Sequence, residues 1–289
     1  MKTFWTIPFC LILAISSRAQ DLHVGLATGL SNYQGDLVDK YYDFRQTNGH
    51  IGITLSYELF DQIILRGGLT HARIQGNDKY QEKDVLVARN LSAKTSITEL
   101  SLVGEFYFNN LYYKRWSPYL FGGVALFHFN PFTLDSSGTK RFLQPLGTEG
   151  QGLAGYNKEP YSRLQLSLPF GGGFKYAVTD DIRVGLEVGL RKTWTDYLDD
   201  VSTNYADPND LINARGPLAA SLAYRGDELP GGDPNIPAKG AQRGGEKYKD
   251  IYYFTGVNVS FRIGKKTTGD DGRYRPGRRN RNACPTVPL

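Results

Sequence analysis

The sequence has no internal run of 18 apolar residues and a mean hydropathy of −0.40, which excludes a membrane-spanning helix. Cysteine and methionine are scarce, with two Cys and one Met in 289 residues. If Cys10 leaves with a signal peptide, Cys284 stands alone and no internal disulfide can form. With 19 Tyr, 15 Phe and 33 Gly, the composition favours a β-protein of the bacterial envelope over a cytosolic enzyme.

Local signatures of chemistry are also missing. Only four histidines occur, and there is no G-x-S-x-G, H-E-x-x-H, Cys-His or glycine-rich phosphate motif. We therefore expect no catalytic residues, no cofactor and no metal site. A Ser-His-Asp set built from distant loop residues needs no local motif, so a loop-borne hydrolase is kept as an alternative. His23 and His50 are expected inside the barrel described below, near strand ends.

Five aspartates follow the seventh expected strand closely: Asp196, Asp199, Asp200, Asp207 and Asp210. Carboxylates at short spacing could bind Ca²⁺. Their spacing matches no Ca²⁺-binding loop, so an acidic, solvated loop is the favoured interpretation.

The N-terminus has the pattern of a secretory signal. Lys2 precedes a short apolar stretch at residues 4–15, and Ser17 with Ala19 forms a small-x-small cleavage site. We expect residues 1–19 to be a signal peptide and the mature chain to start at Gln20; a buried N-terminal helix is the alternative.

The net charge of +5 is unevenly placed. The last 26 residues, 264–289, hold seven Lys or Arg against two Asp, so this segment alone carries +5. With Lys2 and Arg18 also set aside, residues 20–263 carry about −2. The basic pI therefore gives no support for a nucleic-acid partner. The Gly-, Pro- and Arg-rich segment is predicted to be a disordered, basic periplasmic tail.

Hydrophobic alternation of period two recurs along the chain and predicts β-strands. In residues 182–191, five aliphatic side chains alternate with Arg183, Gly185, Glu187, Gly189 and Arg191. The strand over 118–130 is apolar on both faces, so its orientation stays open. We expect eight strands, at residues 22–29, 50–59, 63–74, 97–108, 118–130, 163–176, 182–191 and 253–263.

The connections alternate between long and short, which is typical of an outer-membrane barrel with short periplasmic turns and long extracellular loops. This order places both termini in the periplasm. The long connections are 30–49, 75–96, 131–162 and 196–250, and the short ones are 60–62, 109–117 and 179–181. The predicted fold is all-β: an eight-stranded antiparallel transmembrane β-barrel over residues 20–263, in the cell outer membrane.

Alternation alone does not say which face touches lipid, because a soluble lipocalin-like barrel buries its apolar face. Two features favour lipid outside. Glycines gather on the polar face, where a closed barrel is crowded, with Gly104 as an exception: Gly25, Gly29, Gly52, Gly171, Gly173, Gly185, Gly189 and Gly256. Aromatics gather at strand ends, as in interfacial girdles: Tyr57, Phe106, Phe108, Tyr112, Tyr113, Trp116, Tyr119, Trp194, Tyr197, Tyr252 and Tyr253.

Charged residues on the polar face should then point into the lumen. Eight strands leave an interior just wide enough for side chains, and unpaired buried charge is expensive. We predict that these charges pair and plug the barrel, so that it is no pore. The predicted lumen charge network is Glu58, Arg66, Glu105, Arg163, Lys175, Arg183, Glu187, Arg191 and Arg262.

Four ordered blocks resemble a known family. Residues 32–37 contain Tyr33, Gly35, Asp36 and Leu37 in a Y-x-G-D-L signature, and residues 89–92 with 97–100 match its second loop and fourth strand. Residues 143–152 and 196–202 are the other two blocks. Together they resemble Bacteroidota outer-membrane barrels related to the PorG component of the type IX secretion system. The resemblance spans residues 22–263, without a recognisable motif in 208–246.

The resemblance implies an outer-membrane protein with a structural, porin-like barrel that takes part in protein transport or gliding through periplasmic secretion-ring proteins. Outer-membrane lipid is the other expected partner, and no small-molecule substrate is identified. A barrel whose extracellular loops bind a ligand or the surface layer is the alternative. The family-motif residues are Tyr33, Gly35, Asp36, Leu37, Gly147, Thr148, Glu149, Gly150, Gln151, Gly152, Asp199 and Asp200.

Overall fold

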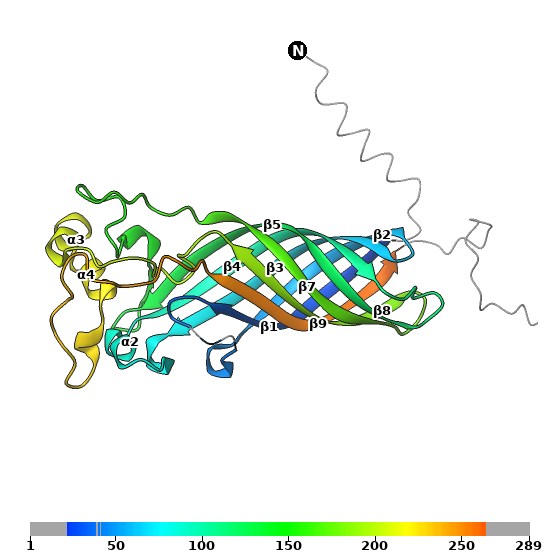
Figure 1. Cartoon of the computed structure of the whole chain (residues 1–289), viewed down its shortest axis with the longest axis horizontal. Helices are drawn as coiled ribbons and strands as arrows, with labels where there is room; N and C mark the ends of the chain where they lie inside the picture. The colour runs from blue at the N-terminus through cyan, green and yellow to red at the C-terminus, as the bar shows by residue number, and fades with distance from the viewer. Residues whose placement is uncertain (1–21, 39, 41, 264–289) are drawn as a thin grey trace, which may run out of the picture.

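Eight long strands form a closed antiparallel barrel in the computed structural model, which describes residues 22–38, 40 and 42–263 (Figure 1). Each strand pairs with its neighbours in the ring, and β1 closes it against β9 while β4 pairs with β5. The predicted fold class is confirmed. The ring consists of β1 (Leu22–Gln34), β2 (Asn48–Phe60), β3 (Ile63–Asn77), β4 (Ser92–Tyr107), β5 (Trp116–Leu134), β7 (Leu164–Ala177), β8 (Ile182–Thr193) and β9 (Ile251–Ile263).

Several strands are longer than their alternation predicted, mostly toward the long loops. β1 continues to Gln34, β4 begins at Ser92, and β5 continues to Leu134. At these ends neither face of a strand touches lipid, because polar loops cover both. The alternation of apolar and polar residues therefore fades, although the backbone pairing continues. A short strand, β6 (Lys140–Phe142), pairs with the end of β5 outside the ring.

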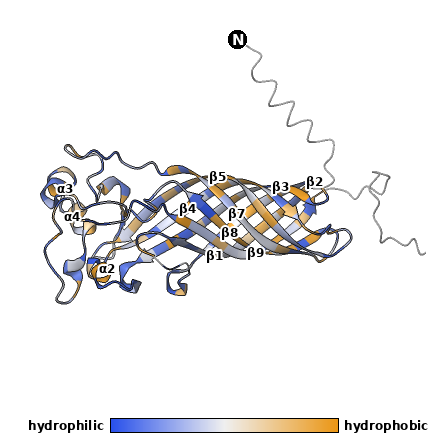
Figure 2. Ribbon diagram, viewed as in Figure 1, coloured by the Kyte–Doolittle hydropathy of each residue, from blue (hydrophilic) through white to orange (hydrophobic). Residues whose placement is uncertain are grey.

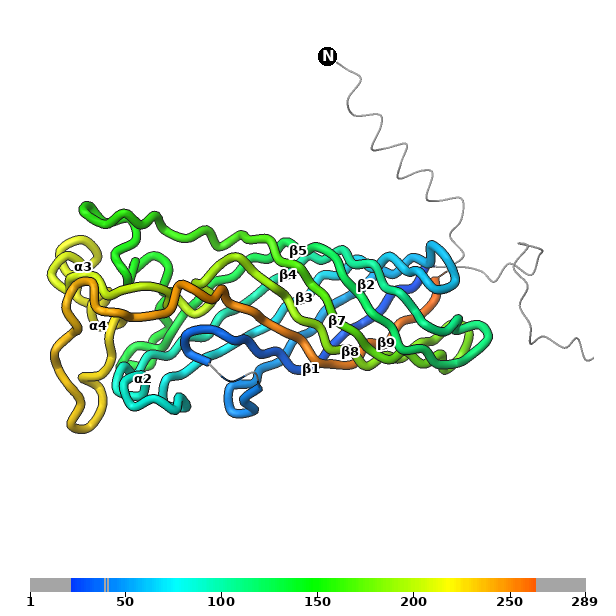
Figure 3. The backbone as a smooth tube through the Cα atoms, viewed as in Figure 1, coloured from blue at the N-terminus to red at the C-terminus, as the bar shows by residue number. Residues whose placement is uncertain are grey.

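The two ends of the barrel differ in size (Figures 1 and 3). Tight turns and the paired strand residues Leu22 and Ile263 form one end, and the long loops gather at the other. The predicted signal peptide and basic tail lie outside the described residues. The loop end holds η2 (Phe44–Gln46), η3 (Asp78–Tyr80), α2 (Asp84–Arg89), η4 (Gln144–Leu146), α3 (Pro208–Arg215), α4 (Pro217–Ala223) and η5 (Gly226–Glu228).

Among the described residues, no helix has the length and apolarity needed to cross a membrane.

Apolar side chains face outward and charged ones inward. Leu186 and Leu166 are 61% and 59% exposed, whereas the side chains of Arg183 and Glu187 are only 6% and 16% exposed. A soluble lipocalin-like barrel would show the opposite arrangement. Figure 2 shows hydrophobic residues alternating with polar ones along the strands. The outer surface is therefore one that only lipid can cover, and the barrel is of the outer-membrane type.

Glycines mark where the interior is most crowded. A Cβ on Gly29 would lie 2.2 Å from the carbonyl oxygen of Thr255, and one on Gly171 would lie 2.2 Å from that of Val188. Backbone atoms cannot move aside, so these positions need glycine. Gly104 faces outward, and its nearest neighbour would be 4.0 Å away.

Strand β5, which the sequence could not orient, turns an aromatic row inward. Leu120 and Val124 are more than half exposed, while Phe121 and Phe127 are buried. Inward aromatic rings are compatible with a charged lumen because cations stack on their faces. The guanidinium carbon of Arg66 lies 5.2 Å from the ring centre of Phe121.

The predicted aromatic girdle is only partly correct. Tyr119 and Tyr252 are buried inside the barrel, and Tyr112 and Tyr197 bind carboxylates at the two ends of the interior. Their hydroxyl groups find acceptors there, which a lipid-facing position would not supply. The exposed girdle members include Phe106, Phe108, Tyr113, Trp116 and Trp194, joined by Phe60, Phe174 and Tyr176.

Candidate functional site: a polar cap over a closed lumen

The lumen near the turn end is filled by contacts around Glu58. One carboxylate oxygen lies 2.5 Å from Nη2 of Arg183 and 3.4 Å from Nε2 of His23. The other accepts a 2.6 Å hydrogen bond from the hydroxyl of Tyr112. Arg262 lies at the same end, where Nη2 donates to Tyr112 and Nε is 3.7 Å from Asp181.

Farther along the lumen, Arg66 joins two carboxylates. Its Nε is 2.8 Å from Glu105, and its Nη1 is 2.8 Å from Glu187. The hydroxyl of Tyr119 donates to Glu187 at 2.7 Å. Lys175 donates to Asn258 at 2.7 Å and completes this layer.

Toward the loops, Arg191 lies 3.2 Å from Glu99 and stacks over the ring of Phe254. Glu99 was not included in the predicted lumen network, although it lies on the same face of its strand as Glu105. Arg163 was wrongly placed in the lumen: it is exposed, directly before β7 begins. The alternation ends there, so parity no longer dictates direction.

These layers leave little open space in the barrel. The void lined by His50, Arg66, Glu187 and Arg191 measures about 40 Å³. This volume can hold about one water molecule and is too small for a solute to pass. The paired charges therefore close the lumen at this level.

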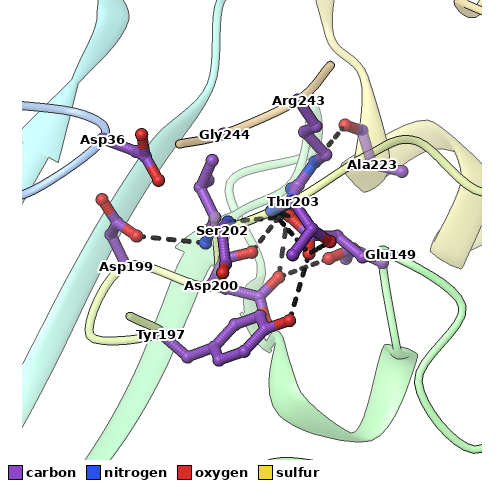
Figure 4. A network of polar contacts seen from close by, with 12 residues as sticks. Asp36, Glu149, Tyr197, Asp199, Asp200, Ser202, Thr203, Ala223, Arg243 and Gly244 are labelled. Carbon is purple, nitrogen blue, oxygen red and sulfur yellow. Dashed lines mark hydrogen bonds and ion pairs between the residues drawn. The ribbon is translucent and has the colours of Figure 1, made fainter. Parts of the chain in front are cut away.

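A second polar network covers the loop end of the barrel, centred on Glu149 (Figure 4). Its fully buried carboxylate accepts hydrogen bonds from the backbone N–H of Ser202 at 2.8 Å and from the Thr203 hydroxyl at 2.6 Å. Arg243 donates to it at 3.0 Å and to the backbone oxygen of Asp200 at 2.6 Å. Arg243 thus binds the 143–152 segment to the last long loop.

The loop carrying Glu149 is shaped by glycines with positive φ. Gly147, Gly150 and Gly152 have φ of +57°, +84° and +73°, where side chains other than glycine are strained. A Cβ on Gly150 would also lie 2.4 Å from the ring of Tyr156. These glycines therefore allow the backbone turns that direct the Glu149 carboxylate toward the last long loop.

Asp199 joins the first loop to the last. Its Oδ2 accepts hydrogen bonds from the hydroxyl of Tyr33 at 3.0 Å and from the backbone N–H of Leu37 at 3.1 Å. A Cβ on Gly35 would lie 2.2 Å from Oδ1 of Asp250. Asp36 accepts from the backbone N–H of Gly245 at 2.9 Å.

The second long loop, between β3 and β4, joins this polar network through Arg89. Its guanidinium makes two 2.7 Å hydrogen bonds to Asp78, a bidentate pair that fixes its plane. It also donates to the backbone oxygens of Arg243 and Asp36. All four long loops therefore meet in one structure, the polar cap: Asp36, Asp78, Arg89, Glu149, Asp196, Asp199, Asp200, Arg243 and Asp250.

An apolar layer seals the space beneath this cap. Leu198 and Phe129 are fully buried there, with Tyr161 stacked on both Phe129 and Tyr197 at 5.9 Å and 4.6 Å. The Tyr161 hydroxyl donates to Asp200 at 2.6 Å. Cap and barrel thus share one core.

The cap contains seven carboxyl groups and two guanidinium groups. Burial raises the pKa of Asp36 and of Asp200 to about 6, and that of Asp196 to about 7. Burial, reinforced by neighbouring carboxylates, also raises the pKa of Asp199 and Asp250. Protonation removes part of the negative charge that two arginines leave unbalanced.

The predicted solvated Asp-rich loop is wrong for three of its five members, because Asp196, Asp199 and Asp200 are buried in the cap. Asp207 caps α3 by accepting from the N–H of Asn209, and Asp210 accepts from Tyr156. Within residues 22–38, 40 and 42–263, no group of His, Cys, Asp or Glu is arranged to hold a metal ion.

A cleft of about 770 Å³ opens beside the cap, between α2 and the last loop. Its walls combine the apolar Val85, which is 81% exposed, with Tyr205 and Tyr224. Arg89 and Arg243 also line the cleft, and both are bound to carboxylates of the cap.

Comparison with known proteins finds one family model and several solved structures. A family model described as "Domain of unknown function (DUF6089)" matches residues 2–144, slightly less than half of the chain. No curated protein matches. The chain is an eight-stranded outer-membrane barrel. That conclusion comes from its lipid-facing wall and filled lumen.

Solved barrels resemble it at low sequence identity. Neisserial surface protein A is 11% identical, with a TM-score of 0.41 over 84% of this chain and 97% of that one. OprG from Pseudomonas aeruginosa is 12% identical, with a TM-score of 0.40 over 84% and 98%. Ail of Yersinia pestis is 10% identical, with a TM-score of 0.37 over 84% and 99%.

The structure brings together residues that the sequence singled out separately. Tyr33, Asp36 and Leu37 of the first block meet Asp199, while Thr148 donates to Asp200 at 2.6 Å. Gln151 Oε1 accepts from the N–H of Glu149. The sequence missed Arg243 and Asp250, which lie outside any recognisable block, and Asp78, whose partner Arg89 stands in the second block.

Proposed function

We propose that this protein is a non-enzymatic, non-conducting outer-membrane barrel that serves as a structural accessory or anchor of type IX protein secretion or gliding machinery. The observation that carries the proposal is the double closure of the barrel, by the lumen charges and by the cap that joins all four long loops. A barrel closed in this way presents rigid surfaces and has no path for a solute. The resemblance of its four motif blocks to PorG-related barrels suggests the secretion role.

The turn end is the proposed contact surface for periplasmic ring proteins. Phe60, Phe108 and Val178 are 66%, 53% and 49% exposed at this end. β9 ends here at Ile263, and the sequence that follows, 264–289, carries a net charge of +5. A partner with an acidic surface would match that charge.

Deletion of residues 264–289 tests the role of this end. The proposal predicts a folded barrel, reduced secretion of type IX cargo, and loss of periplasmic proteins from affinity pull-downs of solubilised outer membranes. A matched variant, Arg243→Met, disrupts the cap on the opposite end and should leave the pull-down unchanged. Normal secretion with unchanged co-purifying proteins after the deletion contradicts the proposed contact.

The cleft of about 770 Å³ supports a second candidate function, binding of an extracellular ligand or surface-layer component by the loops. Val85 lines this cleft and is 81% exposed, so an apolar group of a ligand would find a surface to contact there. Substitution Val85→Glu should abolish surface-layer attachment and spare secretion if this function holds. If secretion falls and attachment is normal, the first function is supported instead.

Nothing in the described loops favours a hydrolase. The four histidines lie in strands: His23 in β1, His50 in β2, His71 in β3 and His128 in β5. A loop-borne Ser-His-Asp set would need one of them near a loop serine, and His71 and His128 point outward from the wall.

A further inference from the structure

The outer wall formed by β3, β4 and β5 changes character abruptly toward the loops. The last row that is apolar on all three strands is Leu69, Leu100 and Leu126, which are 47%, 60% and 41% exposed. The next outward row consists of His71, Thr98 and His128, with His71 Nδ1 lying 3.1 Å from the Thr98 hydroxyl. The edge of the hydrocarbon-facing surface therefore lies between these two rows.

Cations stand directly above that edge. Arg73 pairs with Ser96 in register, and Lys94 pairs with Gln75 one row farther, so the two cations are diagonal neighbours on one face. Lys79 follows in η3, where its Nζ lies 4.6 Å from the ring centre of Tyr80. All three are exposed, and the salt bridges of the described chain use none of them.

Lys79 and Lys94 line a depression of about 280 Å³, and Arg73 lies one row below Lys94 on the same face. Hydrogen-bonding side chains line it beside the lysines, including Gln75, Asn77 and Ser92. We call Arg73, Gln75, Asn77, Lys79, Ser92 and Lys94 the basic wall patch.

Elsewhere at this level, the described wall carries single exposed cations, Arg163 before β7 and Lys192 on β8, instead of a diagonal pair. Outward residues at the loop end of β1 and β2 are apolar, with Leu30 and Ile51 42% and 62% exposed. On β8 a single lysine, Lys192, precedes the exposed Trp194. The neighbouring cations of β3 and β4 are therefore a local feature of this part of the wall.

We propose that the basic wall patch binds the phosphorylated headgroup of an outer-leaflet glycolipid, whose acyl chains lie on the leucine row below. The long loops face outward, so this level of the wall meets the headgroups of the outer leaflet. Exposed lysine and arginine beside amide and hydroxyl donors form charge-assisted hydrogen bonds to phosphate oxygens. The Leu69–Leu100–Leu126 row supplies an adjoining apolar surface, which a free phosphate would not use.

The test uses the full-length protein in lipid nanodiscs, titrated with diphosphoryl lipid A and with its dephosphorylated form. We expect the phosphorylated lipid to bind more tightly, and each removed cation to weaken binding about five-fold at low ionic strength. The variant Arg73→Gln/Lys94→Gln should therefore lose about 25-fold, while the matched control Lys192→Gln keeps native affinity. A thermal unfolding scan in the same discs checks that each variant is folded.

Equal affinity of the double variant and the native protein for diphosphoryl lipid A would overturn the proposal. Equal binding of the phosphorylated and dephosphorylated lipids would also overturn it. Inorganic phosphate is the third arm: if it displaces the lipid at a concentration comparable to that of the lipid, the site is a phosphate site without lipid specificity, and the proposal fails. None of these outcomes depends on the secretion role proposed above.

Discussion

The lumen and the cap both bury charge, but they balance it differently. In the lumen, Glu58, Glu99, Glu105 and Glu187 are matched in number by Arg66, Lys175, Arg183 and Arg191. In the cap, seven carboxyl groups share two arginines. The lumen has lipid around it and little open space inside, so its charges must balance within the barrel as a whole. The cap borders water and can gain or lose protons, so its stability should depend on pH.

The largest expected effect comes from breaking a lumen pair. Arg66→Met leaves Glu105 and Glu187 buried without their shared cation, which should cost about 3–5 kcal/mol of unfolding free energy. Urea unfolding in lipid vesicles measures it through tryptophan fluorescence. Arg163→Met is the control: Arg163 is exposed, and its change should be within about 0.5 kcal/mol. Equal effects of the two variants would contradict a lumen held by paired charge.

Crowding in the lumen should be nearly as costly to disturb. Gly171→Ala would bring its Cβ to 2.2 Å from a backbone oxygen, and we expect a loss of about 1–3 kcal/mol. The outward Gly104→Ala, with 4.0 Å of clearance, serves as the comparison and should be neutral. Urea unfolding in lipid vesicles measures the free energy of unfolding of both variants. A neutral Gly171→Ala would show that the interior has spare room.

The cap should respond to pH where the lumen does not. A folded-state pKa raised to about 7 for Asp196 and about 6 for Asp200 gives stability that is present below pH 4 and lost as pH rises through 6–7. At about 1.4 kcal/mol per pKa unit, the full loss is on the order of 3 kcal/mol for Asp200 and 4 kcal/mol for Asp196. Hydrogen exchange of the loops should therefore be slower at pH 5 than at pH 8 after correction for intrinsic rates.

Asp196→Asn removes one of these titrations and should reduce the pH dependence of loop exchange while the strands exchange as before. Exchange in the cap that is independent of pH, in the native protein, would show that the excess carboxyl groups are compensated in another way.

A small, local effect is expected in the last loop. Asp207→Ala removes the side-chain cap of α3 and should cost about 1 kcal/mol, seen as faster amide exchange in residues 208–215 only. Spread of the effect to Glu149 or Arg243 contacts would mean that α3 and the polar cap unfold together.

The barrel could be predicted from the sequence because lipid enforces the pattern. An outward Leu186 beside an inward Glu187 repeats along each strand, and a shift by one residue would put charge into lipid. The cap could not be predicted in this way. Asp36 and Gly245 are bonded across 209 residues, and Arg89 meets Arg243 across 154. Such pairs leave no periodic signal, and only the motif blocks pointed to part of them.

Arg163 and Tyr119 show where alternation along a strand fails to predict the direction of a side chain. Arg163 is the residue directly before β7, where alternation no longer dictates the direction of a side chain. Tyr119 has the mixed character of a girdle residue, but its hydroxyl binds Glu187 inside the lumen. An aromatic residue with a polar tip satisfies either environment, so its partner decides its place.

Ion conductance tests the central claim most directly, that paired charge closes the barrel between its turns and its cap. Full-length protein reconstituted in a planar bilayer should give no steady current steps above the background of protein-free membranes. The Arg243→Met variant, with its cap disturbed and its lumen intact, should be equally silent. Steady single-channel currents through the native protein would contradict the account.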